Sequence, residues 1–242
     1  MSLARRASAE FAGTALLTAA VVGSGIAATQ LSPHDVGLQL LENAVATALA
    51  LAALILTFGP VSGAHFNPVV SAVDWWCGRS AHSGLTPREL AAYVPAQTAG
   101  AITGAVLADV MFGRPAVAWS HHPRTGGTLW LAEVVATTGL VLLVFALARS
   151  GRTNAAPAAV GAYIGAAYWF TSSTSFANPA VTIGRAFTDT FAGIAPSSVP
   201  GFVAAQVMGA VVAVAGIGWW YPDAARAADQ VTVPRLAAEE VS

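Results

Sequence analysis

The alternation of long apolar stretches and short polar connections is the dominant pattern of this chain. A transmembrane helix needs about 20 consecutive, mostly apolar residues. On this criterion the pattern predicts six membrane-spanning helices. They cover Glu10–Ala28, Leu41–Phe58, Leu90–Val110, Leu129–Ala148, Ala155–Ser173 and Gly201–Trp219.

Two further apolar runs, Val70–Trp76 and Val181–Phe187, are too short to cross a bilayer alone. Each follows an Asn-Pro pair. Asn is a preferred N-cap, and Pro suits the first turn of a helix because it has no N–H that would need a partner. The pattern therefore predicts two half-helices that begin inside the membrane. The two triplets are Asn67-Pro68-Val69 and Asn178-Pro179-Ala180.

Composition supports a membrane protein. The chain has 242 residues, of which 55% are hydrophobic and only 10% charged, and its mean hydropathy is +0.63. A soluble domain typically has about 25% charged residues, so this chain has too few charges to cover a globule in water. The net charge of -1 and the lack of a basic run give no reason to expect a nucleic-acid partner. The expected partner is the lipid bilayer.

The two halves of the chain repeat. The two triplets begin 111 residues apart, and Gln97 and Gln206, in similar Ala-Gln runs, are 109 apart. Three spans per half is an odd number, so the second half is predicted to insert upside down, as in inverted-repeat transporters. The predicted organisation is a first repeat over 1–110, a connection over 111–128, a second repeat over 129–221 and a polar tail over 222–242.

The arginines predict the orientation. Lysine is absent, and cytoplasmic loops are usually enriched in positive residues. Six spans would place most arginines on the side of both termini, which is therefore predicted to be cytoplasmic in the inner (plasma) membrane. These are Arg5, Arg6, Arg79, Arg88, Arg149, Arg152, Arg226 and Arg235, against Arg114, Arg124 and Arg185 on the opposite side.

The paired triplets, the Ser62–Phe66 segment, the paired Glu residues and the paired Ala-Gln-xx-Gly-Ala runs together resemble the aquaporin (major intrinsic protein) family over about residues 8–220. The resemblance implies an all-α membrane fold of six helices plus two half-helices in an inverted repeat. It also implies a pore in each monomer, a homotetramer, no cofactor and no enzymatic reaction. The segment 175–182 resembles a bacterial aquaglyceroporin-like subgroup associated with arsenic resistance.

Several residues are candidates for the pore. Asn67 and Asn178 are expected to cap the half-helices and present amide donors to a passing solute, while the half-helix N-termini repel cations. By resemblance, His65 lines the pore. Glu10 and Glu133 lie in or near hydrocarbon, where acidic residues are usually paired or functional. They either accept hydrogen bonds from the backbone leading to the half-helices or form a proton relay.

The constriction departs from that of water-selective members, which have Arg after the second triplet where this chain has Val181. Carried over without gaps, the other three positions are Thr47, Ala166 and Ser175. This small, uncharged ring predicts passage of solutes larger than water. Arg185 lies one turn beyond Val181, where it either leans towards the pore mouth or pairs elsewhere, for example with Asp189.

The expected function is a passive channel for small uncharged solutes. These include glycerol-like polyols, urea, metalloid hydroxides such as arsenite, methylated arsenicals and water. One alternative is a water-selective pore with an unusual constriction. A second is a proton-coupled transporter that uses Glu10, Glu133 or His65. No spacing typical of a metal site or a catalytic triad is found, so neither a metal nor an enzyme is expected.

Overall fold

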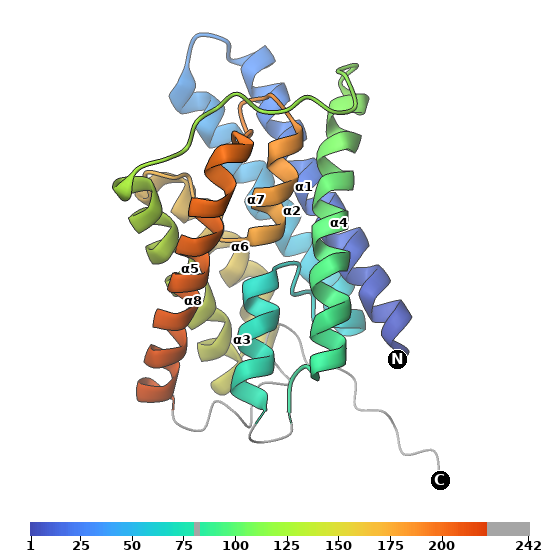
Figure 1. Cartoon of the computed structure of the whole chain (residues 1–242), viewed down its shortest axis with the longest axis vertical. Helices are drawn as coiled ribbons and strands as arrows, with labels where there is room; N and C mark the ends of the chain where they lie inside the picture. The colour runs from blue at the N-terminus through green and yellow to red at the C-terminus, as the bar shows by residue number, and fades with distance from the viewer. Residues whose placement is uncertain (80–82, 222–242) are drawn as a thin grey trace.

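The computed structural model describes residues 1–79 and 83–221, and the regular structure in this part of the chain is helical. The helices run along one long axis, with α7 in the upper half of the bundle and α3 in the lower half (Figure 1). The predicted polar tail, 222–242, lies outside the described residues. The α-helices are α1 (Leu3–Leu31), α2 (Val36–Ser62), α3 (Pro68–Gly78), α4 (Pro87–Met111), α5 (Gly127–Arg149), α6 (Ala156–Phe170), α7 (Pro179–Gly184) and α8 (Val199–Trp220). Short 3-10 turns occur at η1 (Thr153–Ala155), η2 (Arg185–Phe187) and η3 (Pro196–Ser198).

Five of the predicted spans correspond to helices that are long and apolar enough to cross a membrane, namely α1, α2, α4, α5 and η3 with α8. The fifth predicted span is the exception, because α6 has only 15 residues. At 1.5 Å per residue it is about 22 Å long, short of the roughly 30 Å hydrocarbon core. The expected end at Ser173 is wrong, since the chain leaves the helix at Thr171 and turns back into the bundle.

Close helix contacts repeat between the two halves. A Cβ atom on Gly100 of α4 would lie 2.3 Å from the Phe11 carbonyl oxygen of α1. The matching Gly209 of α8 is equally restricted, because its Cβ would lie 2.6 Å from the Val134 carbonyl oxygen of α5. Only glycine permits such approaches. The paired Ala-Gln-xx-Gly-Ala runs thus dock the third helix of each half against the first.

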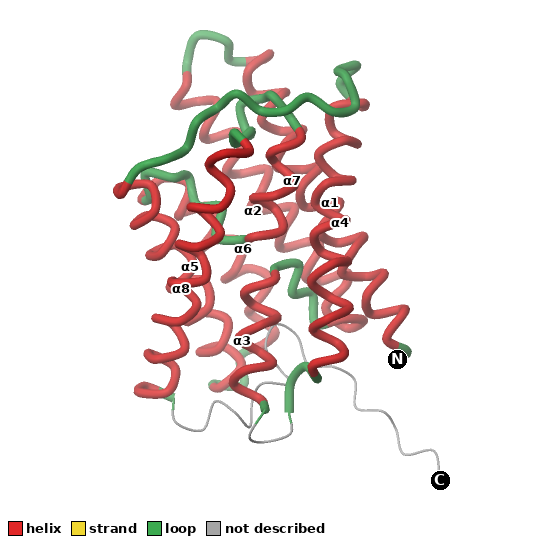
Figure 2. The backbone as a smooth tube through the Cα atoms, in the orientation of Figure 1, coloured by secondary structure: helices red, strands yellow, loops and turns green. Residues whose placement is uncertain are grey.

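The segments that lead into α3 and α7 are non-helical and reach the middle of the bundle (Figure 2). They contain matched residues with left-handed backbone: Ala64 and Phe66 have φ of 49° and 50°, and Ser175 and Ala177 have φ of 49° and 48°. Such conformations cost about 1–3 kcal/mol each for residues other than glycine. The surrounding contacts must therefore impose them, and irregular backbone at this depth needs protein or water around it.

Candidate functional site

The two triplet asparagines brace each other's halves. Asn67 Oδ1 accepts a hydrogen bond from the Val69 N–H at 3.1 Å, and Asn178 Oδ1 accepts one from the Ala180 N–H at 3.0 Å. Across the midplane, Asn67 Nδ2 donates to the Ala177 carbonyl at 2.7 Å and Asn178 Nδ2 donates to the Phe66 carbonyl at 2.8 Å. Each amide nitrogen has two N–H groups. One N–H of each asparagine makes the hydrogen bond between the repeats. The other is left to donate to a molecule in the cavity that both residues border.

Glu10 and Glu133 each support the non-helical segment of their own half. Both are fully buried, and neither borders the cavity. Each accepts hydrogen bonds from one serine hydroxyl, two backbone N–H groups and one glutamine amide. For Glu10 the donors are Ser62 Oγ at 2.6 Å, His65 N at 3.0 Å, Phe66 N at 2.7 Å and Gln97 Nε2 at 2.8 Å. For Glu133 they are Ser173 Oγ at 2.6 Å, Phe176 N at 2.9 Å, Ala177 N at 2.9 Å and Gln206 Nε2 at 2.7 Å.

Gln97 and Gln206 complete this support, although the sequence analysis noted them only as parts of a repeat. Besides its glutamate, Gln97 Nε2 donates to Ser71 Oγ at 2.9 Å, and Gln206 Nε2 donates to Thr182 Oγ1 at 2.8 Å. Ser71 and Thr182 each lie four residues after a triplet asparagine. The matched Gln spacing was the signal in the sequence that could have identified these residues.

Both asparagines border a cavity between the helices, which has about 660 Å³ of empty space, including open solvent. Its wall is mostly apolar, with contributions from α1, α2, α5 and α6. His65 borders it, and its Nδ1 lies 3.0 Å from Ser71 Oγ. Within the part of the chain that is described, no group of three or more His, Cys, Asp or Glu side chains could hold a metal ion.

The structure brings three of the four residues of the predicted constriction to this cavity. Thr47, Ser175 and Val181 border the cavity, but Ala166 is exposed on the outside of α6. The prediction for Ala166 is wrong because Ala166 lies two residues from both Ile164 and Tyr168, which border the cavity. Two residues along an α-helix turn a side chain by about 200°, to the opposite face. Tyr168 occupies the inner face instead, and its hydroxyl lies 3.2 Å from Thr47 Oγ1. The stripe Val160, Ile164 and Tyr168, spaced by four residues, could have indicated this face.

Arg185 also borders the cavity, so the ring is accompanied by a positive charge that the uncharged-ring prediction lacked. Its side chain is buried. The guanidinium carbon lies 3.4 Å from the centre of the Phe176 ring, and Nε donates to the Ala192 carbonyl. The expectation that it could pair with Asp189 is wrong, because η2 ends at Phe187 and Asp189 lies in the following loop beside His121 and His122.

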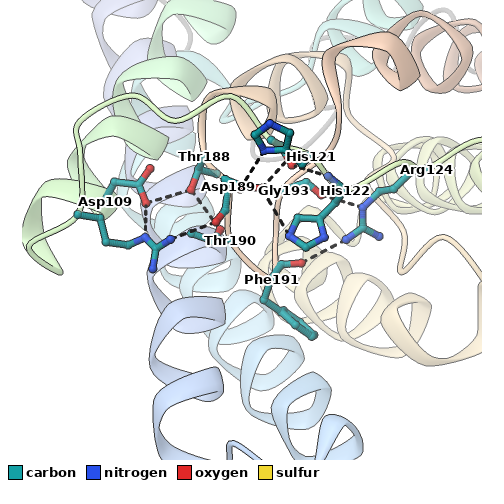
Figure 3. Close-up of polar contacts among 11 residues, drawn as sticks. Asp109, His121, His122, Arg124, Thr188, Asp189, Thr190, Phe191 and Gly193 are labelled. Carbon is teal, nitrogen blue, oxygen red and sulfur yellow. Dashed lines mark hydrogen bonds and ion pairs between the residues drawn. The ribbon is translucent and has the colours of Figure 1, made fainter.

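The loop that follows Arg185 is covered by residues 118–124 of the connection between the halves, here called the strap (Figure 3). Ala118 N and Ser120 N donate to the carbonyls of Phe187 and Ala186 at 3.0 and 3.1 Å. Arg124 Nε donates to the Gly193 carbonyl at 2.8 Å. In addition, Asp189 Oδ1 accepts a hydrogen bond from His121 N at 2.9 Å. The strap therefore fixes the loop whose Ala192 carbonyl orients Arg185.

The contact between Asp189 and the strap predicts an acid-sensitive loop. Hydrogen bonds from the His121 backbone and side chain lower the pKa of Asp189. A lowered pKa means that the stabilising contribution is complete above the ordinary Asp value of about 3.9 and is lost as pH falls through the lowered pKa. Hydrogen exchange of residues 118–124, corrected for intrinsic rates, should therefore rise only in strong acid.

Asp189→Asn should speed this exchange several-fold at neutral pH, a modest change because the contact is partly exposed. It should also remove the acid transition. Asp35→Asn is the matched control, since Asp35 caps α2 and does not contact the strap. Equal exchange in the wild type and Asp189→Asn would show that the strap does not depend on this carboxylate.

Comparison with known proteins gives consistent similarities. The family model described as major intrinsic protein matches residues 1–177. Aquaglyceroporin AqpS of Rhizobium meliloti (strain 1021) is 53% identical over 217 residues, which cover 90% of each chain. Probable aquaporin AqpM of Archaeoglobus fulgidus is 31% identical over 248 residues, covering 91% of this chain and 97% of the relative. The crystal structure of the aquaglyceroporin from Plasmodium falciparum has a TM-score of 0.66 at 20% identity, over 92% of this chain and 98% of that one. The aquaporin-like fold is thus confirmed.

Proposed function

This chain belongs to the major intrinsic protein family, and from that premise we infer the kind of solute that the channel carries. Proteins of this family are channels and not enzymes, so the chain is a multi-pass membrane channel for water or small solutes. We propose that small uncharged hydroxylated solutes pass through it down their gradients. Glycerol-like polyols, metalloid hydroxides such as arsenite, methylated arsenicals and water belong to this class.

The observation that carries the proposal is the pair of asparagines that hydrogen-bond across the two halves and border the cavity. Each keeps an amide N–H for a solute oxygen, and each caps a half-helix. A helix N-terminus has about half a positive elementary charge, so two such ends beside a narrow path disfavour a passing cation. A neutral solute with oxygen acceptors meets no such barrier, because the amides replace the hydrogen bonds it gave up in water.

Hydroxyl groups at the constriction favour solutes that both donate and accept hydrogen bonds. Ser175 is buried, and its Oγ has no hydrogen-bond partner among the described residues. A buried hydroxyl without a partner is unfavourable, which supports a role in contact with transient solutes. Thr47 and Tyr168 place two further hydroxyl groups in the same wall. Arsenious acid and glycerol each present three hydroxyl groups and no charge.

The geometry argues against the proton-coupled alternative. A relay carboxylate must exchange protons with the path, whereas Glu10 and Glu133 each already accept four hydrogen bonds away from the cavity. The water-selective alternative is disfavoured by Val181, because a small apolar side chain stands where water-selective members have Arg, which leaves the path wider at that position. Each alternative predicts a pattern of solute flux that differs from that of a passive channel for neutral solutes.

Stopped-flow measurements on proteoliposomes with the purified protein test the proposal. Glycerol and arsenite should enter well above the rate of protein-free vesicles, and the larger polyol mannitol should not. Collapse of the proton gradient should leave these rates unchanged. Water flux alone would instead favour the water-selective pore, and flux that depends on the proton gradient would favour the transporter.

We also propose a homotetramer in the plasma membrane with both termini cytoplasmic. The excess of arginine on the side of the N-terminus supports this orientation. Large apolar side chains such as Leu49 and Trp169 are exposed on the outside of a single chain, where lipid or another subunit would cover them. Native mass spectrometry tests the tetramer. Protease access at the termini of right-side-out vesicles tests the orientation, and cleavage from outside would contradict it.

A further inference from the structure

We propose that Arg185 is the charge that excludes cations from this channel, supplied one helical turn beyond the position at which Val181 offers none. This inference rests on the proposed function and deepens it, because it names the residue that makes the pathway selective for neutral solutes. Tyr168, Ser175 and Val181 border the same cavity. The α7 side of the pathway thus combines an aromatic side chain and a guanidinium, although the residue after the second triplet is a valine.

The position of Arg185 is built by contacts on several sides. It is 3% exposed, and the ring of Phe176, which also borders the cavity, lies against its guanidinium. The Ala192 carbonyl accepts a hydrogen bond from Nε, and the Ile194 N–H donates to the Arg185 carbonyl at 3.3 Å. Hydrogen bonds between the strap and residues 186–195 hold this loop in place. An arginine held this firmly cannot swing out to solvent, as a flexible surface side chain would.

Within the described residues, no carboxylate forms an ion pair with Arg185. Asp189 contacts His121 and His122. Asp109 lies near Arg114 and accepts a hydrogen bond from Thr188. Glu133 attracts Arg185 electrostatically without forming an ion pair, and its oxygens accept hydrogen bonds from four other donors. Because water screens little in a narrow, mostly apolar path, an unpaired guanidinium there repels a cation more strongly than it would at a wet surface.

Arg124 provides a matched control. Its guanidinium carbon lies 5.1 Å from the centre of the same Phe176 ring, but Arg124 does not border the cavity. Removal of either arginine changes the charge near this ring by the same amount. Only removal of Arg185 takes the charge away from the path.

The test measures sodium leak and glycerol flux in the same proteoliposomes. Arg185→Gln should raise the ratio of sodium to glycerol flux at least about tenfold. Arg124→Gln removes hydrogen bonds to the Phe191 and Gly193 carbonyls but leaves the Arg185 charge beside the path, so it should raise the ratio much less. The double variant Val181→Arg with Arg185→Gln, which moves the charge back by one turn, should lower the sodium leak again; the leak itself is compared here, because arginine at position 181 also slows glycerol. A wild-type ratio in Arg185→Gln, or an equal rise in Arg124→Gln, would overturn the proposal.

Arg185→His keeps the test decisive if Arg185→Gln does not assemble. An imidazole gains its charge between about pH 8 and pH 5, so sodium leak through this variant should be high in mild alkali and suppressed in mild acid. The wild type, which also contains His65, should show no such change. A leak independent of pH in Arg185→His would contradict a charge barrier. Failure of the wild type to carry glycerol or arsenite would defeat the proposed function, whereas the sodium comparison tests Arg185 alone.

Discussion

Glu133→Leu is expected to prevent assembly of the channel. Leucine leaves the Ser173 hydroxyl, the Phe176 and Ala177 N–H groups and the Gln206 amide without their acceptor. Each buried donor left unpaired costs about 1–3 kcal/mol. Together these losses approach the whole stability of a typical folded domain, about 5–15 kcal/mol. Size-exclusion chromatography of detergent-solubilised protein should show little monodisperse material.

Two further variants serve as controls for this result. Glu133→Gln keeps the shape and one oxygen acceptor, so its yield should fall between those of Glu133→Leu and the wild type. Asp35→Asn changes an exposed carboxylate at the N-cap of α2 to a residue that also caps helices, and it should have a small effect. Normal assembly of Glu133→Gln, together with loss of a proton-gradient dependence that the wild type shows, would instead support the relay.

Val181→Arg is expected to suppress glycerol and arsenite flux at least about tenfold while reducing water flux less. Val181 borders the cavity beside Ser175 and one turn before Arg185. A guanidinium there would narrow the path and place a second positive charge in it. Larger solutes lose more than water because they need the full width of the opening. Stopped-flow light scattering on matched proteoliposomes measures all three rates.

Val181→Leu separates size from charge. It adds apolar volume without a donor, so it should slow glycerol only moderately. If Val181→Arg left glycerol and arsenite rates at the wild-type level, Val181 would not lie at the constriction. Equal suppression of water and glycerol would indicate a general block of the path rather than a change in selectivity.

Local sequence patterns predicted most of the helices. The apolar stretches gave the long spans to within a few residues at most ends, and α1 extended furthest beyond its prediction, to Leu3. Asn67 and Asn178 marked the starts of α3 and α7 because capping depends only on neighbouring residues. The end of α6 was missed because Thr171–Ser173 are compatible with a helix, and only the contact of Ser173 with Glu133 draws them into a loop.

The constriction was less predictable. Thr47, Ser175 and Val181 border the cavity, which is consistent with the proposed constriction, but the side chain of Ala166 does not. Its place depends on how α6 is rotated about its own axis against α2, where Gly161 packs near the Ala48 carbonyl. Arg185 was left open because four residues could continue a helix or end it. The structure ends α7 at Gly184, and the strap then decides where the next loop lies.

The sequence by itself determined that this chain crosses a membrane repeatedly and begins two half-helices inside it. Hydropathy and capping depend on neighbouring residues, and the repeat is visible when matching positions of the two halves are compared. Only the tertiary structure decided that each asparagine braces the opposite half, that the paired glutamates are occupied by donors, and that Tyr168 and Arg185 border the cavity. Those facts depend on helix rotation and on contacts between residues far apart in the chain, and no local pattern encodes them.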